Sequence, residues 1–234
     1  MYFMKQTFPI IGHWSVTLYH MVLNKNKNFC YRVCHIENLG SILSNGLCTK
    51  YHPKADKRFI SIGHPEIIGV RDITPVKIDG YGNIGDYVPF YFTPRSMMLY
   101  NIITGYQAPL VPKRRKEELM VLRCVIQDLA KAGQFFFTDG QANATSITNH
   151  YNNLDALDQI DWEIIQKGDF RKEAADIDKQ RRYQAEFLIH NHVGIHYIES
   201  FHVYNAKAVT FVTEELSKTD IIKPVHITTS YLFD

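Results

Sequence analysis

The sequence predicts a single domain of the α+β class. Its 234 residues, of which 45% are hydrophobic and 13% aromatic, are enough to bury one substantial core. Short β-prone runs alternate with short helical periods, and no internal repeat or linker interrupts them. We therefore expect one domain over residues 29–234, with residues 1–28 as an N-terminal extension packed on its body.

Seven runs of apolar and aromatic residues favour β-strands, because they are short and bounded by turn residues. The second run contains Pro89, which lacks an N–H and so requires a sheet edge or an irregularity. The seven runs are residues 29–34, 87–93, 120–126, 135–138, 185–190, 201–204 and 225–232.

Helices are expected between these strands. Ile36, Leu39, Ile42 and Leu43 recur at helical spacing, and Asn45-Gly46 supplies a left-handed stop. Further helices are expected over residues 96–104, 127–132, 154–165 and 207–216. Residues 48–85, rich in proline and glycine, are expected to form a long loop of the kind that binds ligands.

The net charge of +2 is too small to indicate a nucleic-acid-binding protein by itself, so such a function must depend on local basic patches. One patch is Lys113 to Lys116, for which a solvated loop is the preferred interpretation. The other is Lys179, Arg181 and Arg182, which we expect on a loop where the three cations can meet nucleic-acid phosphates. Pairing of this second patch with Asp176 and Asp178 is the alternative.

The four cysteines, Cys30, Cys34, Cys48 and Cys124, show neither zinc-type spacing nor a secreted disulfide pattern, which favours the reducing cytoplasm. No apolar run is long enough for a membrane span, and the first residues lack the pattern of a signal peptide. His190 and His192 would share one strand face, but no further ligand completes a metal motif, so no metal is expected.

Glu186 opens the apolar run Phe187-Leu188-Ile189, directly after Arg181-Arg182-Tyr183-Gln184-Ala185. A carboxylate at the start of a buried strand is either a surface charge or a functional acid. On these residues alone the surface charge is the more usual of the two. His35 lies between a strand and a short helix, and it also has two interpretations. It either contacts a ligand or caps the helix.

Four segments, taken in their order and spacing, resemble the DarT family of DNA ADP-ribosyltransferase toxins. They are residues 31–39 with Gly46, residues 86–100, residues 157–162 and residues 181–188. The resemblance covers most of residues 29–234. It implies an ADP-ribosyltransferase-like split mixed β-sheet around an NAD cleft, transfer of ADP-ribose from NAD to a base in single-stranded DNA, and a cognate antitoxin protein as partner.

The resemblance also implies roles for particular residues. Glu186 matches the family's catalytic glutamate, and Arg71 resembles its catalytic-loop arginine. Residues in the segments that line the NAD site are His35, Asn38, Gly46, Tyr91, Met98 and Tyr100. These residue types suit the reaction. Breaking the nicotinamide–ribose bond develops positive charge, which a carboxylate stabilises. Arginine binds the diphosphate of NAD.

Gln141 departs from the family pattern, since members often carry a histidine in this segment. Guanine and thymine both occur as family targets, and Gln141 makes guanine slightly favoured here. Three alternatives stay open at this point. The protein could modify RNA or protein, it could be an NAD glycohydrolase, or it could be a non-catalytic nucleic-acid-binding domain that has kept the fold.

Overall fold

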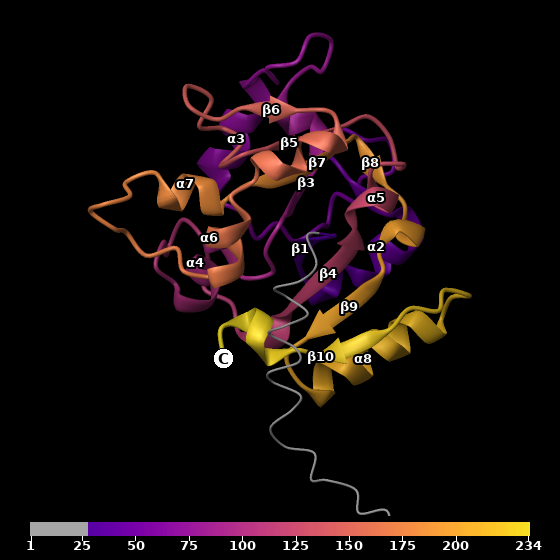
Figure 1. Ribbon diagram of the computed structural model, residues 1–234. Coiled ribbons are helices and arrows are strands. Elements are labelled where there is room, and N and C mark those ends of the chain that lie inside the picture. The colour runs from indigo at the N-terminus through magenta and orange to yellow at the C-terminus, as the bar shows by residue number, and fades with distance from the viewer. Residues whose placement is uncertain (1–27) are drawn as a thin grey trace, which may run out of the picture.

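The computed structural model describes residues 28–234, and these residues form an eight-stranded mixed sheet flanked by helices (Figure 1). The strand order is β10-β9-β4-β1-β3-β7-β5-β6, and a separate two-stranded sheet pairs β2 with β8. The strands are β1 (Phe29–His35), β2 (Leu47–Cys48), β3 (Tyr87–Tyr91), β4 (Leu119–Val125), β5 (Phe135–Thr138), β6 (His150–Tyr151), β7 (Glu186–His190), β8 (His192–Val193), β9 (Ser200–Val203) and β10 (Val225–Ile227).

The α-helices of this part of the chain are α2 (Leu39–Asn45), α3 (Pro65–Ile73), α4 (Met97–Thr104), α5 (Ile126–Leu129), α6 (Trp162–Lys167), α7 (Lys179–Tyr183) and α8 (Ala206–Ser217). Figure 1 shows α3, α4, α6 and α7 gathered on one side, whereas α8 lies beside β10 at the opposite end. All neighbouring strands of the large sheet are antiparallel except β9 and β10, which run parallel. The predicted α+β class with a mixed sheet is confirmed.

The large sheet divides into two halves between β1 and β3. Tyr31 and Tyr91 are the one residue pair that registers these two strands, whereas β1 registers with β4 along its whole length. Pro89 in β3 has no N–H to give to a ladder, so the pairing cannot continue past it. The Arg32 guanidinium bridges the opening instead, donating through Nη1 to the Pro89 carbonyl at 2.8 Å. The irregularity that Pro89 predicts is therefore the split of the sheet.

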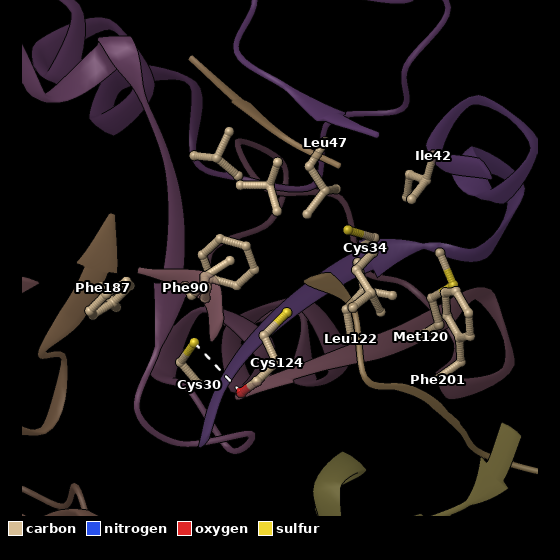
Figure 2. Close-up of a cluster of buried hydrophobic side chains, with 14 of the residues drawn as sticks. Cys30, Cys34, Ile42, Leu47, Phe90, Met120, Leu122, Cys124, Phe187 and Phe201 are labelled. Atoms are coloured by element: carbon tan, nitrogen blue, oxygen red, sulfur yellow. Dashed lines mark hydrogen bonds between the residues drawn. The ribbon is translucent and has the colours of Figure 1, made fainter. Parts of the chain in front are cut away.

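Two hydrophobic clusters cover the two faces of β1 and β4, as the alternation of side chains along a strand requires. On one face Cys30, Cys34 and Cys124 pack with residues of α2 and α8. Figure 2 shows this cluster, in which the Cys30 thiol contacts the Cys124 carbonyl at 3.9 Å. Tyr31 and Val33 point to the other face, where they meet α4. Cys30, Cys34, Cys48 and Cys124 are all free thiols.

Two helix ends confirm the turn chemistry read from the sequence. Gly46 ends α2 with φ 73°, and Gly105 ends α4 with φ 75° and ψ 22°, a left-handed conformation that suits glycine. At the other end of α4, the Ser96 hydroxyl accepts from the Leu99 N–H at 3.2 Å. The predicted helix after β3 is thereby confirmed, and the one after β1 is confirmed from Leu39 on, where it follows a 3-10 helix over Ile36–Asn38.

Several expected boundaries are wrong. The expected loop over residues 48–85 contains α3, which was missed because it has no buried face to create a hydrophobic period. The single helix expected over residues 154–165 is a 3-10 helix, Leu154–Gln159, followed by α6, because the Asp161 carboxylate caps a new helix by accepting from the Ile164 N–H. The last expected strand ends at Ile227, and Thr229–Leu232 forms a 3-10 helix.

Two further expectations are wrong, and a third lies outside the described residues. Lys179, Arg181 and Arg182 lie on α7 rather than on a loop. His190 and His192 do not share a strand face, because Asn191 between them has φ 64° and separates β7 from β8. The expected N-terminal extension lies outside the described residues except for Asn28.

Within residues 28–234, no helix combines the length and the apolar character needed to cross a bilayer. The same residues bring no three histidine, cysteine, aspartate or glutamate side chains together in a way that could hold a metal ion.

His202 forms a buried polar link at the β9–β10 edge of the sheet. Its Nε2 lies 2.9 Å from the Ser200 hydroxyl, and its Nδ1 lies 2.9 Å from the Thr228 hydroxyl. The side chain is only 1% exposed. Burial, with the nearby charge of Arg123, lowers the pKa of His202 from 6.5 to about 3. The folded protein therefore holds this imidazole neutral.

We predict that His202 makes the fold acid-sensitive. The unfolded chain takes up a proton near pH 6.5 and the folded protein does so only near pH 3, so stability is lost as pH falls through this window. The loss from this group approaches about 1.4 kcal/mol per pH unit. Urea unfolding at several pH values should show a shallower acid loss for His202→Gln than for the wild type. Equal pH dependence in the two proteins would contradict the assignment.

Candidate active site

A cavity of about 290 Å³ lies where the two halves of the sheet part. Residues of β1 and β3 form its floor, α3 and the segment before it cover one side, and α4 forms another wall. The polar lining residues are Arg32, Ser61, His64, Arg71, Tyr91, Asn101, Gln107, Gln141, Asn143, Gln184 and Glu186. The site is concave and combines these polar groups with an apolar lining, which is a common form of a ligand site.

Glu186 is the first residue of β7 and is only 2% exposed. The surface-charge interpretation is therefore wrong. Its Oε2 accepts from Arg71 Nη1 at 2.8 Å, and its Oε1 accepts from the Ala142 backbone N–H at 3.1 Å. A buried carboxylate needs partners of this kind, because an isolated buried charge is strongly unfavourable. Both oxygens are fixed in direction within a cavity.

Arg71 approaches from α3, and its side chain is 12% exposed. Its second terminal nitrogen, Nη2, is buried and has no hydrogen-bond partner among the described residues. Arg32 lines the same cavity from β1, and its Nε is likewise buried without a partner in this part of the chain. Two guanidinium groups that line this cavity thus have N–H donors that the described residues leave unused, a suitable arrangement for an anionic ligand.

Tyr91 and Met98 also line the cavity, as the sequence-based assignment expects. Tyr91 registers with Glu186 across the β3–β7 ladder. Burial, together with the negative charge of Glu186, raises the pKa of Tyr91 above its ordinary value. The phenol is therefore protonated and able to donate.

His35 and Asn38 line neither of the two cavities that the structure shows beside the split sheet. The His35 ring caps the turn after β1, since Nδ1 accepts from the Glu37 N–H at 3.3 Å, and burial lowers its pKa. The Asn38 amide holds the backbone of Ile60 through bonds of 2.9 and 2.8 Å. Because residues 59–64 line the cavity, Asn38 fixes the position of a cavity wall without lining the cavity itself. The contacts of His35 are therefore those of a capping residue.

A second cavity, of about 540 Å³, meets the first at Arg32, Arg71 and Pro89. Gly46 borders it, and a Cβ atom on this glycine would come within 2.5 Å of the Val193 carbonyl. Gly46 is therefore needed for the close approach of β2 and β8. Tyr100 lines neither cavity. Its ring is 39% exposed and packs against Phe170 and Phe233, with centroid distances of 5.3 and 5.5 Å.

The three cations of α7 are paired with carboxylates. Lys179 pairs with Asp169 and Glu173, Arg181 pairs with Asp139 and Asp178, and Arg182 pairs with Asp161, Asp176 and Asp178. Three positive charges thus meet six different carboxylates. Hydrogen bonds from Arg182 and Arg181 respectively hold the pKa values of Asp176 and Asp178 below the usual range. A contact of these cations with DNA stays a prediction.

The sequence-based selection missed Arg32, Asn143 and Gln184 as cavity residues. Arg32 and Gln184 fall within segments that carry the family resemblance, so their positions could have been selected as polar members of strand β1 and of the entrance to β7. Asn143 has no such signal. It is brought to Glu186 by its neighbour Ala142, through a backbone contact that no side-chain pattern encodes.

Comparisons with known proteins agree with this geometry. A family model described as "ssDNA thymidine ADP-ribosyltransferase, DarT" matches residues 31–233. The chain is 37% identical over 216 residues to a DNA ADP-ribosyl transferase of Escherichia coli O127:H6 (strain E2348/69 / EPEC), covering 92% of this chain and 98% of that protein.

Solved structures of DarT from Thermus sp. 2.9 are also similar. The complex with ADP-ribosylated ssDNA superposes with a TM-score of 0.79 at 28% identity, covering 88% of this chain and 97% of that one. The complex with NAD+ gives 0.75 at 27% identity, covering 89% and 98%. A family match over nearly the whole described chain, joined to a buried Glu–Arg pair in the cleft of a split sheet, shows that this chain belongs to the DarT family of NAD-dependent DNA ADP-ribosyltransferases.

Proposed function

We propose that this enzyme transfers ADP-ribose from NAD to a base of single-stranded DNA, releases nicotinamide, and acts as the toxin of a toxin–antitoxin pair in the cytoplasm. The observation that carries the proposal is the ion pair between Glu186 and Arg71, buried in the cavity between the half-sheets. The Thermus relatives, solved with NAD+ and with ADP-ribosylated ssDNA, support the two substrates. The cognate antitoxin protein follows from the family resemblance.

The chemistry follows from the charges in the cavity. The bond between ribose C1′ and the nicotinamide nitrogen breaks, its electron pair leaves with nicotinamide, and positive charge develops on the ribose. Glu186 stabilises that charge and takes the proton that the acceptor base loses as it bonds to C1′. The free N–H groups of Arg71 and Arg32 bind the diphosphate. Tyr91 and Met98 contribute to holding the nicotinamide end.

The acceptor base is either guanine or thymine. Gln141, where family members often carry histidine, lines the cavity and slightly favours guanine, whereas the description of the family model names thymidine. Asn143 lies two residues further on, and its buried Oδ1 has no partner among the described residues, so it is available to accept from a base N–H.

Mass spectrometry of single-stranded oligonucleotides, each with one guanine or one thymine, after incubation with NAD tests the proposal. One added ADP-ribosyl group should appear on DNA, and fragmentation identifies the base. Transfer to RNA or protein, or release of free ADP-ribose alone, would support the corresponding alternative enzyme. Complete absence of NAD turnover would support the non-catalytic domain.

We predict that Glu186→Gln lowers the transfer rate by about 10²-fold or more, because the carboxylate charge acts on the developing positive charge. The fold should persist, since glutamine fills the same volume. Transfer to an oligonucleotide, measured beside the thermal midpoint, checks both statements. Glu199→Gln is a matched control, because Glu199 forms an ion pair with Arg123 but lines neither cavity. Equal activity of wild type and Glu186→Gln would refute the catalytic role.

Lys113 and Arg114 are the better-placed cations for DNA phosphates. Lys113 is exposed, Arg114 is partly exposed, and neither forms an ion pair within the described residues, in contrast to the cations of α7. They follow the segment that contains the exposed Tyr106 and the cavity residues Gln107 and Val111. A segment that carries both an exposed aromatic ring and cations without ion pairs is suited to binding single-stranded DNA.

We predict that Lys113→Ala/Arg114→Ala lowers the slope of log affinity against log salt by about 0.7 for each phosphate that the protein no longer neutralises. Oligonucleotide binding at several salt concentrations measures the slope. Lys218→Ala/Lys223→Ala, which removes the same formal charge at and after the C-terminal end of α8, should leave it unchanged. If instead Lys179→Ala/Arg182→Ala flattens the slope and the first variant does not, the DNA path runs over α7.

A further inference from the structure

The carboxylate of Glu186 is fixed by the segment that follows β5. The Glu186 backbone N–H donates to Thr138 Oγ1 at 3.2 Å, and this hydroxyl donates to the Gly140 carbonyl at 2.6 Å. Two residues later, the Ala142 N–H donates to Glu186 Oε1 at 3.1 Å. Both the backbone and one carboxylate oxygen of Glu186 therefore depend on the path of residues 138–142, which we call the carboxylate turn.

Arg181 holds the carboxylate turn from the other side. Its Nη1 donates to Asp139 Oδ1 at 3.0 Å and to Thr148 Oγ1 at 3.2 Å, so it contacts both ends of the loop between β5 and β6. The Arg181 carbonyl accepts from the Gln141 N–H at 3.0 Å. Asp178 fixes the remaining guanidinium nitrogens, Nε and Nη2, at 2.7 and 2.8 Å. The side chain is 13% exposed, and its three nitrogens are all engaged.

Gly140 lets the guanidinium come this close. A Cβ atom at residue 140 would lie 2.2 Å from Arg181 Nη1 and 2.9 Å from Cζ. The φ of Gly140 lies outside the left-handed range, so its backbone conformation does not require glycine. The close approach of Arg181 is the reason that a larger residue does not fit.

We propose that Arg181 is a positioning residue for Glu186, acting through the carboxylate turn, rather than a contact for DNA phosphate. The proposal rests on the proposed role of Glu186. Arg181 sets where the Ala142 N–H lies, and this N–H sets the direction of the carboxylate. A displacement of the reacting groups by about 1 Å is enough to lower a rate about 10²-fold. Four of its five N–H groups are already engaged, so a two-pronged contact with a DNA phosphate would require Arg181 to give up a bond that holds this geometry.

The test compares Arg181→Met with Arg182→Met. The two arginines are adjacent, and both are paired with carboxylates, but only Arg181 contacts the carboxylate turn. Arg181→Met should lower kcat by about 10- to 100-fold, with the KM values for NAD and oligonucleotide and the salt slope of DNA binding unchanged. Arg182→Met should leave kcat near the wild-type value. Thermal midpoints establish that both variants are folded.

Gly140→Ala gives a second, smaller perturbation of the same contact. Alone it should lower kcat, because the new methyl group displaces the guanidinium. In the Arg181→Met background its further effect should be smaller, because the closest atoms, Nη1 and Cζ, are gone and only the Cγ contact at 3.0 Å remains. Non-additive effects of the two substitutions on kcat would indicate that both act on Glu186 through the same contact. A purely global loss of stability would not produce such non-additivity.

The outcomes separate the two proposals. If the wild type modifies DNA and Arg181→Met raises KM for the oligonucleotide and flattens the salt slope with kcat unchanged, Arg181 is a DNA contact and the positioning role is refuted. Independent, additive losses from Gly140→Ala and Arg181→Met also refute it. If Glu186→Gln is fully active, the proposed catalytic role has failed, and that result is visible without either Arg181 variant.

Discussion

The ion pair between Glu186 and Arg71 is the interaction on which the site depends. A carboxylate that is 2% exposed is sustained only if its charge is balanced and its oxygens are hydrogen-bonded. Arg71 provides the charge from α3, and the Ala142 N–H provides the second bond. One strand, one helix and one turn, far apart in the sequence, are thus tied to a single side chain. Without substrate, these partners keep the carboxylate balanced in charge and fixed in direction.

The space for a substrate comes from interrupting the sheet at one place. Pro89 cannot continue the β1–β3 ladder, and the two strands register only through Tyr31 and Tyr91. Arg32 spans the opening by donating to the Pro89 carbonyl, which leaves its Nε facing no protein partner within the described residues. The interruption therefore both opens the cleft and places a second arginine in it. An unbroken ladder would have closed this space with backbone hydrogen bonds.

The sequence predicted what local patterns encode. The strands that carry Tyr91 and Glu186 are clear from their apolar runs, and Gly46 and Gly105 end helices as glycines do. Helix α3 was missed because no face of it is buried, so no hydrophobic period marks it. Among the partners of the α7 cations, Asp176 and Asp178 are close enough in the sequence to be expected, whereas Asp139 and Asp161 are too distant in the sequence for a local pattern to indicate them. Likewise, a backbone N–H such as that of Ala142 leaves no trace in residue type.

Equal charges on two surfaces have different consequences because their surroundings differ. The α7 cations meet six carboxylates, so that surface presents no excess of positive charge to a phosphate chain. In the first cavity, Glu186 is the one carboxylate among the described lining residues, it pairs with Arg71, and Arg71 and Arg32 retain unused donors. We therefore expect an anionic co-substrate to bind at Arg32 and Arg71 in the cleft rather than at the paired cations of α7. A basic run in a sequence indicates a binding surface only where the fold leaves its charges unpaired.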